Sequence, residues 1–405
     1  MVKKIAGKAG IVKNTILSLL LLLNMLLIPG CSGDESVASS DDSTVDTIRI
    51  GVYQPLSGDD KDAARPEIMG IELAHKLNPR VLGKKVELIY GDNKSNIIDG
   101  TIAAQKMVNK KVAIVLGSYG NTMSMTGGDY FREAGIPAIA ITCTNPLVTK
   151  GNPYYFRVCT IDSFQAVMAA KYVYNELGTE NVVIMKLGED DYGSALAQQF
   201  SDKLTSLTKS EDAESTKVTT VEYDKTTTDY SKQFEQIKAS RAEVIYLPCP
   251  AKEAVEIIIQ ARKYGVKALF VGTDLWHEAD FIERGGAAVE GVLFTDYFDA
   301  ESAATEKAEE FLSAYHKEYG EDPPESATAL GYDAYMLALH AIEKQAEQKT
   351  VTLRDLLAGT REYAGITGNI TFDNEGDPIK SVVLTTVEGG EFKHKYTAEP
   401  EWNQQ

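Results

Sequence analysis

Residues 137–158 read PAIAITCTNPLVTKGNPYYFRV, two short apolar runs separated by residues that favour turns. The first run ends in a polar segment, 142–146. Asn145-Pro146 is typical of a helix start, with Asn at the N-cap and Pro at the first helical position. Thr144 then lies just outside the helix, where its hydroxyl could shape the turn or bind a small anion beside free N–H groups. The pattern leaves both interpretations open.

Apolar runs of this kind recur along the chain and alternate with segments of helical periodicity, such as Leu196, Phe200, Leu204 and Leu207. Short apolar strands separated by helices predict mostly parallel sheets covered by helices on both faces. The expected strands are IRIGVYQP (48–55), KVELIYGD (85–92), VAIVLG (112–117), PAIAIT (137–142), YYFRVC (154–159), NVVIMKL (181–187), VTTVEYD (218–224), VIYLPC (244–249), ALFVGTD (268–274) and VLFTDYF (292–298).

These strands form two units of similar size. In the C-terminal part, strands and helices no longer alternate. Two helical segments flank Asp322-Pro323-Pro324, a short third helix follows in TLRDLLAGT, and GNITFDNEGDP and SVVLTTVEGGEFKHKY predict a strand and a hairpin with a Gly-Gly turn. We expect an α/β fold with two lobes, each a mostly parallel sheet flanked by helices. The expected limits are 48–162 plus 298–370 for the first lobe, and 163–297 plus 371–400 for the second.

The N-terminus predicts export. Four Lys residues precede an apolar run that is too short and too interrupted for a comfortable membrane span, which is typical of a secretory signal over residues 1–30. Ile-Pro-Gly-Cys resembles the lipobox of bacterial lipoproteins, which implies lipidation of Cys31 after cleavage. Residues 31–47 are acidic and rich in Ser, as in a flexible tether. An uncleaved signal anchor is the alternative.

The charge excludes nucleic acid as a partner. The whole chain has a formal net charge of −18, and without residues 1–30 the 37 basic and 59 acidic residues leave −22, so no basic patch can neutralise phosphates. Three further cysteines, Cys143, Cys159 and Cys249, show no spacing typical of a metal site, and the sequence does not indicate which of them pair. We expect no metal and no cofactor.

In open α/β sheets, ligands bind beyond the carboxyl ends of strands, so the residues that follow each strand are the candidates for a site. The segment after the first strand lacks GxGxxG, the main signature of a dinucleotide site. After the third strand, Gly117–Thr122 could let backbone N–H groups approach a ligand, or Asn121 or Thr122 could simply cap the next helix.

In the second unit, Asp191-Tyr192-Gly193 begins a predicted helix, and Asp274 ends a strand. Asp274 could hold an ammonium group or cap a helix over 276–282. The chain has no GxSxG, SxxK, P-loop or HExxH motif, so we expect a protein that is not an enzyme.

From Ile48 to Lys395 the chain resembles the branched-chain amino-acid receptor family, the type I solute-binding proteins of ABC importers. The most specific matching pieces are GIPAIAITCTNPLVTKGNPYYFRV and ITGNITFDNEGDP. Nine others occur in the family's order: IRIGVYQPLSG, VELIYGDNKSN, AAQKMV, DDYGSALA, DYSKQFEQIKASRAEVIYL, QARKYGVKALFVGTD, GVLFTDYF, FLSAYHKEYGEDPP and ALGYDAYMLAL. The resemblance implies two lobes joined by three hinge crossovers and an amino-acid site between them.

The resemblance also assigns roles to residues of the site. The loop 118–122 and the Thr144 hydroxyl would bind the α-carboxylate, the backbone of Thr142 and the Asp274 carboxylate would bind the α-ammonium, and Tyr192 would contact the ligand from the second lobe. The expected ligand-binding residues are Ser118, Tyr119, Asn121, Thr122, Thr142, Thr144, Tyr192, Asp274 and Trp276.

The chain departs from the family at two places. Asn121 stands where many members have Ser, and Asp62, Ala63 and Arg65, with Trp276, predict a more polar pocket than a branched aliphatic side chain needs. Arg157 lies in the strand before the first crossover and is interpreted as structural. The implied function is an extracytoplasmic, lipid-anchored protein that captures an amino acid or amino-acid-like small molecule and delivers it to ABC permease subunits. The alternative is a sensor ectodomain of the same fold.

Overall fold

The computed structural model describes residues 47–210, 216–278, 280–300, 306–321, 323 and 325–400. The predicted signal segment, the lipidation site Cys31 and nearly all of the tether lie outside the described residues. Both sheets described below belong to a single compact unit, so the contacts between them are part of the fold.

The first sheet has the strand order β2-β3-β1-β4-β5-β6. Only β2 runs antiparallel to its neighbour, and the other pairs are parallel. Its central strand, β1, pairs Ile50 with Leu88 on one side and with Ile114 on the other. The strands are β1 (Thr47–Gln54), β2 (Arg80–Val81), β3 (Lys84–Asp92), β4 (Ile114–Leu116), β5 (Ala138–Ala140) and β6 (Tyr155–Arg157).

The second sheet has the order β16-β15-β11-β10-β9-β7-β8. Its first five strands in the chain are parallel, and the C-terminal hairpin adds two antiparallel strands at the β11 edge. The hairpin turns at Gly389-Gly390, as the sequence predicts. The strands are β7 (Asn181–Leu187), β8 (Lys217–Tyr223), β9 (Val244–Tyr246), β10 (Leu269–Gly272), β11 (Leu293–Asp296), β15 (Val382–Glu388) and β16 (Glu391–Ala398).

Helices cover both faces of the first sheet. Alternate strand residues point to opposite sides, so apolar side chains on each side pack against helices. Ile114 and Leu116 pack with α1 (Lys61–Leu77), α10 (Ser326–Glu347) and α11 (Leu353–Ala358). Val115 packs on the other face with α2 (Ile97–Asn109) and α3 (Asn121–Glu133). Helices α1 and α10 approach closely at Gly70, where a Cβ would lie 2.0 Å from the Thr328 carbonyl oxygen. This packing fixes the helix that carries Glu67.

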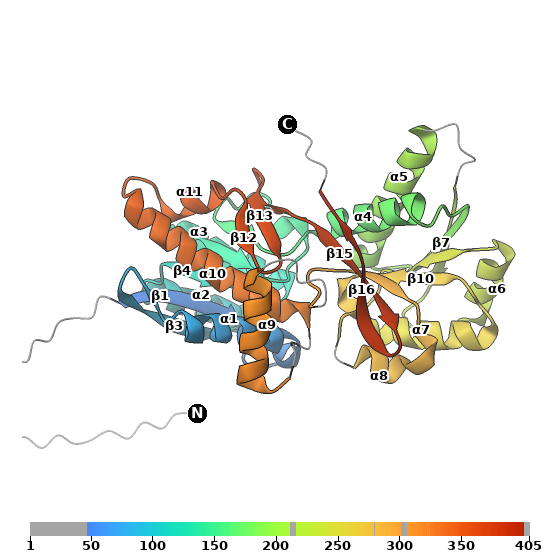
Figure 1. Ribbon diagram of the computed structural model, residues 1–405, viewed down its shortest axis with the longest axis horizontal. Coiled ribbons are helices and arrows are strands. Elements are labelled where there is room, and N and C mark those ends of the chain that lie inside the picture. The colour runs from blue at the N-terminus through green and yellow to red at the C-terminus, as the bar shows by residue number, and fades with distance from the viewer. Residues whose placement is uncertain are drawn as a thin grey trace, which may run out of the picture. The chain divides into compact units, whose positions relative to one another are not determined.

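The second sheet is covered in the same way (Figure 1). One face packs on α4 (Asp162–Asn175) and α5 (Asp191–Ser210), where Leu196, Phe200 and Leu204 are buried at the predicted helical spacing. The opposite face packs on α6 (Ser231–Ala239), α7 (Ala251–Tyr264) and α8 (Phe281–Gly285). The predicted two-lobed α/β fold with mostly parallel sheets is confirmed.

In the described part of the chain, the path crosses between the two lobes three times: after β6, after β11 and between β14 (Pro378–Ile379) and β15. After the second crossover, α9 (Glu306–Tyr319) leads to α10. A small sheet, β12 (Tyr363–Gly365), β13 (Gly368–Phe372) and β14, precedes the third crossover. Phe372 packs in the core of the first lobe against Phe156, with ring centroids 5.2 Å apart. The expected limit at residue 370 stays a prediction, and this contact favours a limit a few residues later.

Candidate functional site

The carboxyl ends of the parallel strands in both lobes open into one cavity of about 810 Å³. Six of the nine predicted ligand-binding residues line it: Tyr119, Asn121, Thr142, Thr144, Tyr192 and Asp274. Asp62 and Ala63, from the unusual segment after β1, line it as well. The remaining lining residues are Gly120, Cys143, Leu187, Asp190, Cys249, Pro250, Glu253, Leu275, His277, Glu278, Asp280, Tyr297, Glu325, Ser326 and Ala327.

Trp276 does not line this cavity, contrary to the expectation from the sequence. Its side chain is fully buried, its Nε1 donates to the Cys249 carbonyl at 2.9 Å, and its ring stacks on Phe281. The ring covers the end of β10 so closely that a Cβ on Gly272 would meet it at 2.2 Å. The indole is part of the core of the second lobe and offers no surface to a ligand. Arg65, also expected in the pocket, is exposed and does not line it.

Ser118 is likewise enclosed by protein. Its hydroxyl accepts from Asn93 Nδ2 at 2.7 Å and donates to the Tyr119 carbonyl at 2.8 Å, and the residue has no exposed surface. Ser118 therefore shapes the loop behind Tyr119 rather than lining the cavity.

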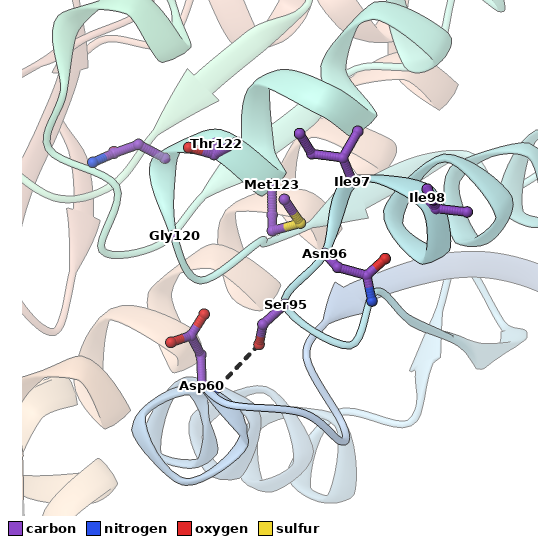
Figure 2. A pocket seen from close by; sticks show the side chains of 9 residues that line it. Asp60, Ser95, Asn96, Ile97, Ile98, Gly120, Thr122 and Met123 are labelled. Carbon is purple, nitrogen blue, oxygen red and sulfur yellow. Dashed lines mark hydrogen bonds between the residues drawn. The ribbon is translucent and has the colours of Figure 1, made fainter.

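Thr122 lines a separate hollow of about 630 Å³, shown in Figure 2. Its rim is built from Asp60, whose backbone N–H donates to Ser95 Oγ at 3.0 Å, and from exposed Ile97 and Ile98 at the start of α2. Thr122 thus faces a different part of the surface from the other predicted residues, although Gly120 and Asn121 line both hollows.

The capping predictions had mixed outcomes. Asn145 is the N-cap of a 3-10 helix, Pro146–Val148, and its side chain accepts from the Leu147 N–H, as expected. Neither Asn121 nor Thr122 caps α3 with its side chain, because Gly120 occupies the N-cap. Asn121 Oδ1 instead accepts the Asn145 N–H at 3.2 Å and joins the two strand-end loops.

Asp274 does not cap a helix over 276–282 either. Thr273 is the N-cap of a 3-10 helix, Asp274–Trp276, and α8 begins only at Phe281. Asp274 Oδ2 accepts from the Tyr297 hydroxyl at 2.6 Å, while Oδ1 is buried and has no hydrogen-bond partner. Burial raises the pKa of Asp274 to about 6. One carboxylate oxygen is therefore available to a donor from a ligand.

Behind Thr142 lies a carboxyl group that the sequence analysis missed. Glu67, fully buried on α1, accepts from Gln54 Nε2 at 2.6 Å and from the Thr142 hydroxyl. Gln54 Oε1 in turn accepts the Tyr119 N–H at 2.7 Å. Burial raises the pKa of Glu67 to about 7. This network links two lining residues, Tyr119 and Thr142, to one buried acid.

A second missed acid supports Thr144. Asp162, the first residue of α4, donates its backbone N–H to the Thr144 carbonyl at 3.3 Å. Burial raises the pKa of the Asp162 carboxyl to about 7, the charge of Asp274 raises it further, and the neighbouring Thr144 hydroxyl opposes that rise. The Thr144 side chain is 7% exposed, and that small surface faces the cavity.

Tyr192 enters the site from the start of α5, as predicted, and its hydroxyl donates to Thr273 Oγ1 at 3.3 Å. Cys143 and Cys249 line the same cavity from opposite lobes. Together with Cys159 they are free and buried, so no disulfide joins the three cysteines that the structure describes. Burial raises the pKa of the Cys143 thiol to about 12, which disfavours a reactive thiolate.

Arg157 lies outside the cavity, in agreement with its structural interpretation. Its guanidinium is fully buried, forms an ion pair with Asp377 at 2.6 Å, and donates to the carbonyls of Cys143 and Asn145 at 2.5 and 2.9 Å. It therefore holds the backbone on which Thr144 is placed.

The lining is strongly acidic. Seven of the lining residues carry carboxyl groups, and His277 is the only basic one among the described residues. His277 Nδ1 contacts the Asp296 carboxylate, which raises the pKa of His277 against the opposing effect of burial. Within the described ranges, no group of three or more His, Cys, Asp or Glu side chains has the arrangement of a metal site.

Three of the missed acids could have been found from their place in the sequence. Asp190 and Glu278 lie in segments that follow strands, and Asp162 lies at the predicted first crossover. Glu67 and Glu325 have no such marker, because their roles depend on contacts across the packing of α1 and α10.

Comparisons with known proteins indicate the family and the fold of the chain. The periplasmic binding protein family model matches residues 47–391. A Leu/Ile/Val-binding protein homolog of Brucella abortus is 27% identical over 356 residues, which cover 86% of this chain and 93% of the relative.

Two solved structures are also similar. A leucine binding protein from Thermotoga maritima is 32% identical with a TM-score of 0.76, and the match covers 87% of this chain and 99% of that chain. A branched-chain amino acid transporter substrate binding protein from Streptococcus pneumoniae, solved with isoleucine, is 26% identical with a TM-score of 0.74, over 88% of this chain and 99% of that chain. These matches confirm the family resemblance and place the chain among solute-binding proteins rather than enzymes.

Proposed function

We propose, from the premise that this chain belongs to the periplasmic binding protein family, that it is the solute-binding protein of an ABC importer and captures an amino acid between its lobes. Relatives that bind leucine or isoleucine support an amino acid as the class of ligand. The delivery partner would be the permease in the membrane.

The observation that carries this proposal is the buried Oδ1 of Asp274, which has no hydrogen-bond partner. The wall that the first lobe contributes to the same cavity would suit a carboxylate. On that wall, Gly120 and Asn121 stand at the start of α3, where backbone N–H groups lack partners within the helix. The Thr144 hydroxyl lies beside them, next to the loop that Asn121 joins. An α-amino acid carries an ammonium and a carboxylate on adjacent atoms, which is the pair of charges that these two walls would receive.

In the proposed mechanism, the ligand first meets the first lobe through Asn121, Thr144 and the N–H groups at the start of α3. The second lobe then closes and brings Tyr192 and Asp274 onto the ligand. Closure is driven only by the difference in affinity between the closed and open states. The Gln54–Glu67–Thr142 network keeps the first wall in place before the ligand arrives.

We propose further that the mature chain is exported and anchored through a lipid on Cys31. None of the helices that the structure describes is long and apolar enough to cross a membrane. If a lipid on Cys31 is the anchor, the Cys31→Ser variant should leave the membrane fraction. Retention of this variant in washed membranes would contradict the lipid anchor and favour a signal anchor.

A thermal-shift screen of the full chain against the proteinogenic amino acids and related small amines and acids tests the function. A ligand at about 100 times its Kd stabilises a protein by about 2.7 kcal/mol, which is a shift of several degrees. We expect at least one α-amino acid to raise the melting temperature of the wild type, and to raise that of Asp274→Asn by about half as much or less. A wild type that responds to no α-amino acid would contradict the function.

A further inference from the structure

We propose that the amino acid bound between the lobes has a positively charged side chain, so that the substrate class of this protein is the basic amino acids. The inference rests on the proposed function, because it assumes that the α-ammonium and α-carboxylate bind as described above. It concerns the remaining part of the cavity, where the side chain of the ligand must lie.

The charges that line the cavity are almost all negative. The seven carboxyl groups come from both lobes, and no Lys or Arg stands among the lining residues that the structure describes. The lining carboxyl groups belong to Asp62, Asp190, Glu253, Asp274, Glu278, Asp280 and Glu325. An ordinary zwitterionic amino acid brings one ammonium group, and Asp274 alone can accept it.

Some of the remaining acids have structural partners. Asp190 Oδ2 accepts the Gly193 N–H at 2.6 Å at the start of α5, and Asp280 forms an ion pair with Arg284 at 3.2 Å. Glu253, Glu278 and Glu325 form no ion pair with any described Lys or Arg. These three are free to pair with a cation that the ligand supplies.

Glu253 and Glu325 are the most suitable of the three, because they are half-buried and stand on opposite lobes. Glu253 lies in the first turn of α7, and Glu325 lies just before α10. Burial raises the pKa of both. The Tyr223 hydroxyl opposes the rise at Glu253 and His277 opposes it at Glu325, while the neighbouring acids Asp190, for Glu253, and Glu278 and Asp280, for Glu325, add to it. A partly buried acid that neighbouring acids repel is stabilised by a cation placed beside it.

A neutral side chain would leave this repulsion in place and would add a cost. When the lobes close over a ligand, water leaves the cavity and the carboxylates lose hydration. A side-chain ammonium or guanidinium offsets that loss with charge-assisted hydrogen bonds, and an aliphatic side chain does not. An acidic side chain would add repulsion, so the same lining excludes it.

The cavity also has apolar surface for the stem of such a side chain. Leu187, Pro250 and Leu275 line it together with the acids and Tyr192. Lysine and arginine side chains have this dual character, an apolar stem that ends in a cation. The mixed lining therefore fits a long cationic side chain better than a short polar one.

Calorimetric titration of the full wild-type chain with matched ligands tests the inference. L-norleucine has the carbon chain of L-lysine without the terminal amine, and L-citrulline replaces the guanidinium of L-arginine by a neutral urea group. We expect L-lysine or L-arginine to bind at least about tenfold more tightly than its neutral counterpart. If a neutral or branched-chain amino acid binds as tightly or more tightly, the inference fails and the proposed function stands. If no α-amino acid binds, both fail.

Variants then test which acids hold the side-chain cation. Glu253→Gln combined with Glu325→Gln should weaken binding of the preferred basic amino acid by about tenfold, and should change the affinity for its neutral counterpart less than twofold. Glu256→Gln, on the exposed face of the same helix α7, is the matched control and should leave both affinities unchanged. Equal losses for the charged and the neutral ligand would overturn the assignment, and the melting temperature of each variant shows whether it is folded.

Discussion

Two sets of buried charges in this protein differ in how they are neutralised. Near the third crossover, Arg157 is paired with Asp377, and Lys380 lies beside Asp333, whose carboxylate accepts the backbone N–H groups of Ile366 and Thr367 at 2.7 and 2.9 Å. At the cavity, by contrast, the buried acids have hydroxyl or amide donors but no basic partner, apart from the contact of His277 with Asp296.

This difference separates the buried charges that stabilise the fold from those that we propose to contact the ligand. A buried charge that the protein pairs within itself needs nothing from outside, and its loss should unfold the chain. A buried acid without a basic partner destabilises the unliganded protein and gains a partner only when a ligand arrives. Substitutions in the first set should therefore lower stability. Substitutions in the second should change affinity where the acid contacts the ligand, and should leave stability unchanged or raise it.

The largest expected effect is that of Arg157→Met on stability. The change leaves Asp377 buried without its partner and removes the donors to the Cys143 and Asn145 carbonyls. We expect the free energy of unfolding, measured with urea, to fall by about 3–5 kcal/mol. If the variant proves too unstable to purify, Arg157→Lys, which keeps a positive charge beside Asp377, should give part of the wild-type yield. A fall in the free energy of unfolding of less than about 1 kcal/mol would contradict the role of Arg157 as a charge that stabilises the fold.

Asp274→Asn should have the next largest effect, on affinity rather than stability. The amide can still accept from Tyr297, but it cannot neutralise an ammonium group. We expect the affinity for the preferred amino acid to fall at least about tenfold, which corresponds to about 1.4 kcal/mol, with a melting temperature equal to or above that of the wild type. Unchanged affinity in calorimetry would remove Asp274 from the site.

Thr144→Val should weaken binding by about tenfold, because it removes the hydroxyl proposed for the α-carboxylate while keeping the shape of the side chain. Thr149→Val, on the structural side, is the matched control, because its hydroxyl contacts Asp377 and Arg157 rather than the cavity. Thr149→Val should lower stability and leave affinity nearly unchanged. Unchanged affinity in Thr144→Val, or lost affinity in Thr149→Val, would contradict the distinction between the two sets.

The smallest expected effect is a gain in stability in Glu67→Gln, and it depends on pH. The pKa of Glu67 is raised by burial from 4.5 to about 7, so the folded state holds this proton at pH values where the unfolded chain has lost it. Its ionisation therefore lowers the free energy of unfolding as pH rises from about 4.5 to above 7. We expect Glu67→Gln to be more stable than the wild type at pH 8, and the difference to shrink toward pH 5. A difference that does not vary with pH would contradict the raised pKa.

The sequence predicted the parts of this molecule that depend on local pattern. Short apolar strands, the helix periodicity of Leu196 to Leu207, and the Asn145-Pro146 start all follow from neighbours in the chain. Strand ends could be recognised as candidates for the site because parallel strands bring their carboxyl ends together. Thr144, Tyr192 and Asp274 were predicted in this way and line the cavity, and the ligand-binding roles that the family resemblance gives them stay predictions.

The remainder depends on contacts that no local pattern reveals. Trp276 follows a strand as Asp274 does, but the ring turns into the core over Gly272. Glu67 meets Thr142 only because α1 packs against the sheet at the level of β5, 75 residues farther along the chain. The acidity of the whole chain gave no guide to which carboxylates would face one cavity.

A crystal structure of the chain with the amino acid that stabilises it most tests the central claim directly. We predict the ligand between the lobes, its ammonium within hydrogen-bond distance of Asp274 Oδ1 and its carboxylate beside Thr144 and Asn121. A ligand bound elsewhere, for example in the hollow of Asp60 and Thr122, or bound between the lobes without contact to Asp274, would contradict the account.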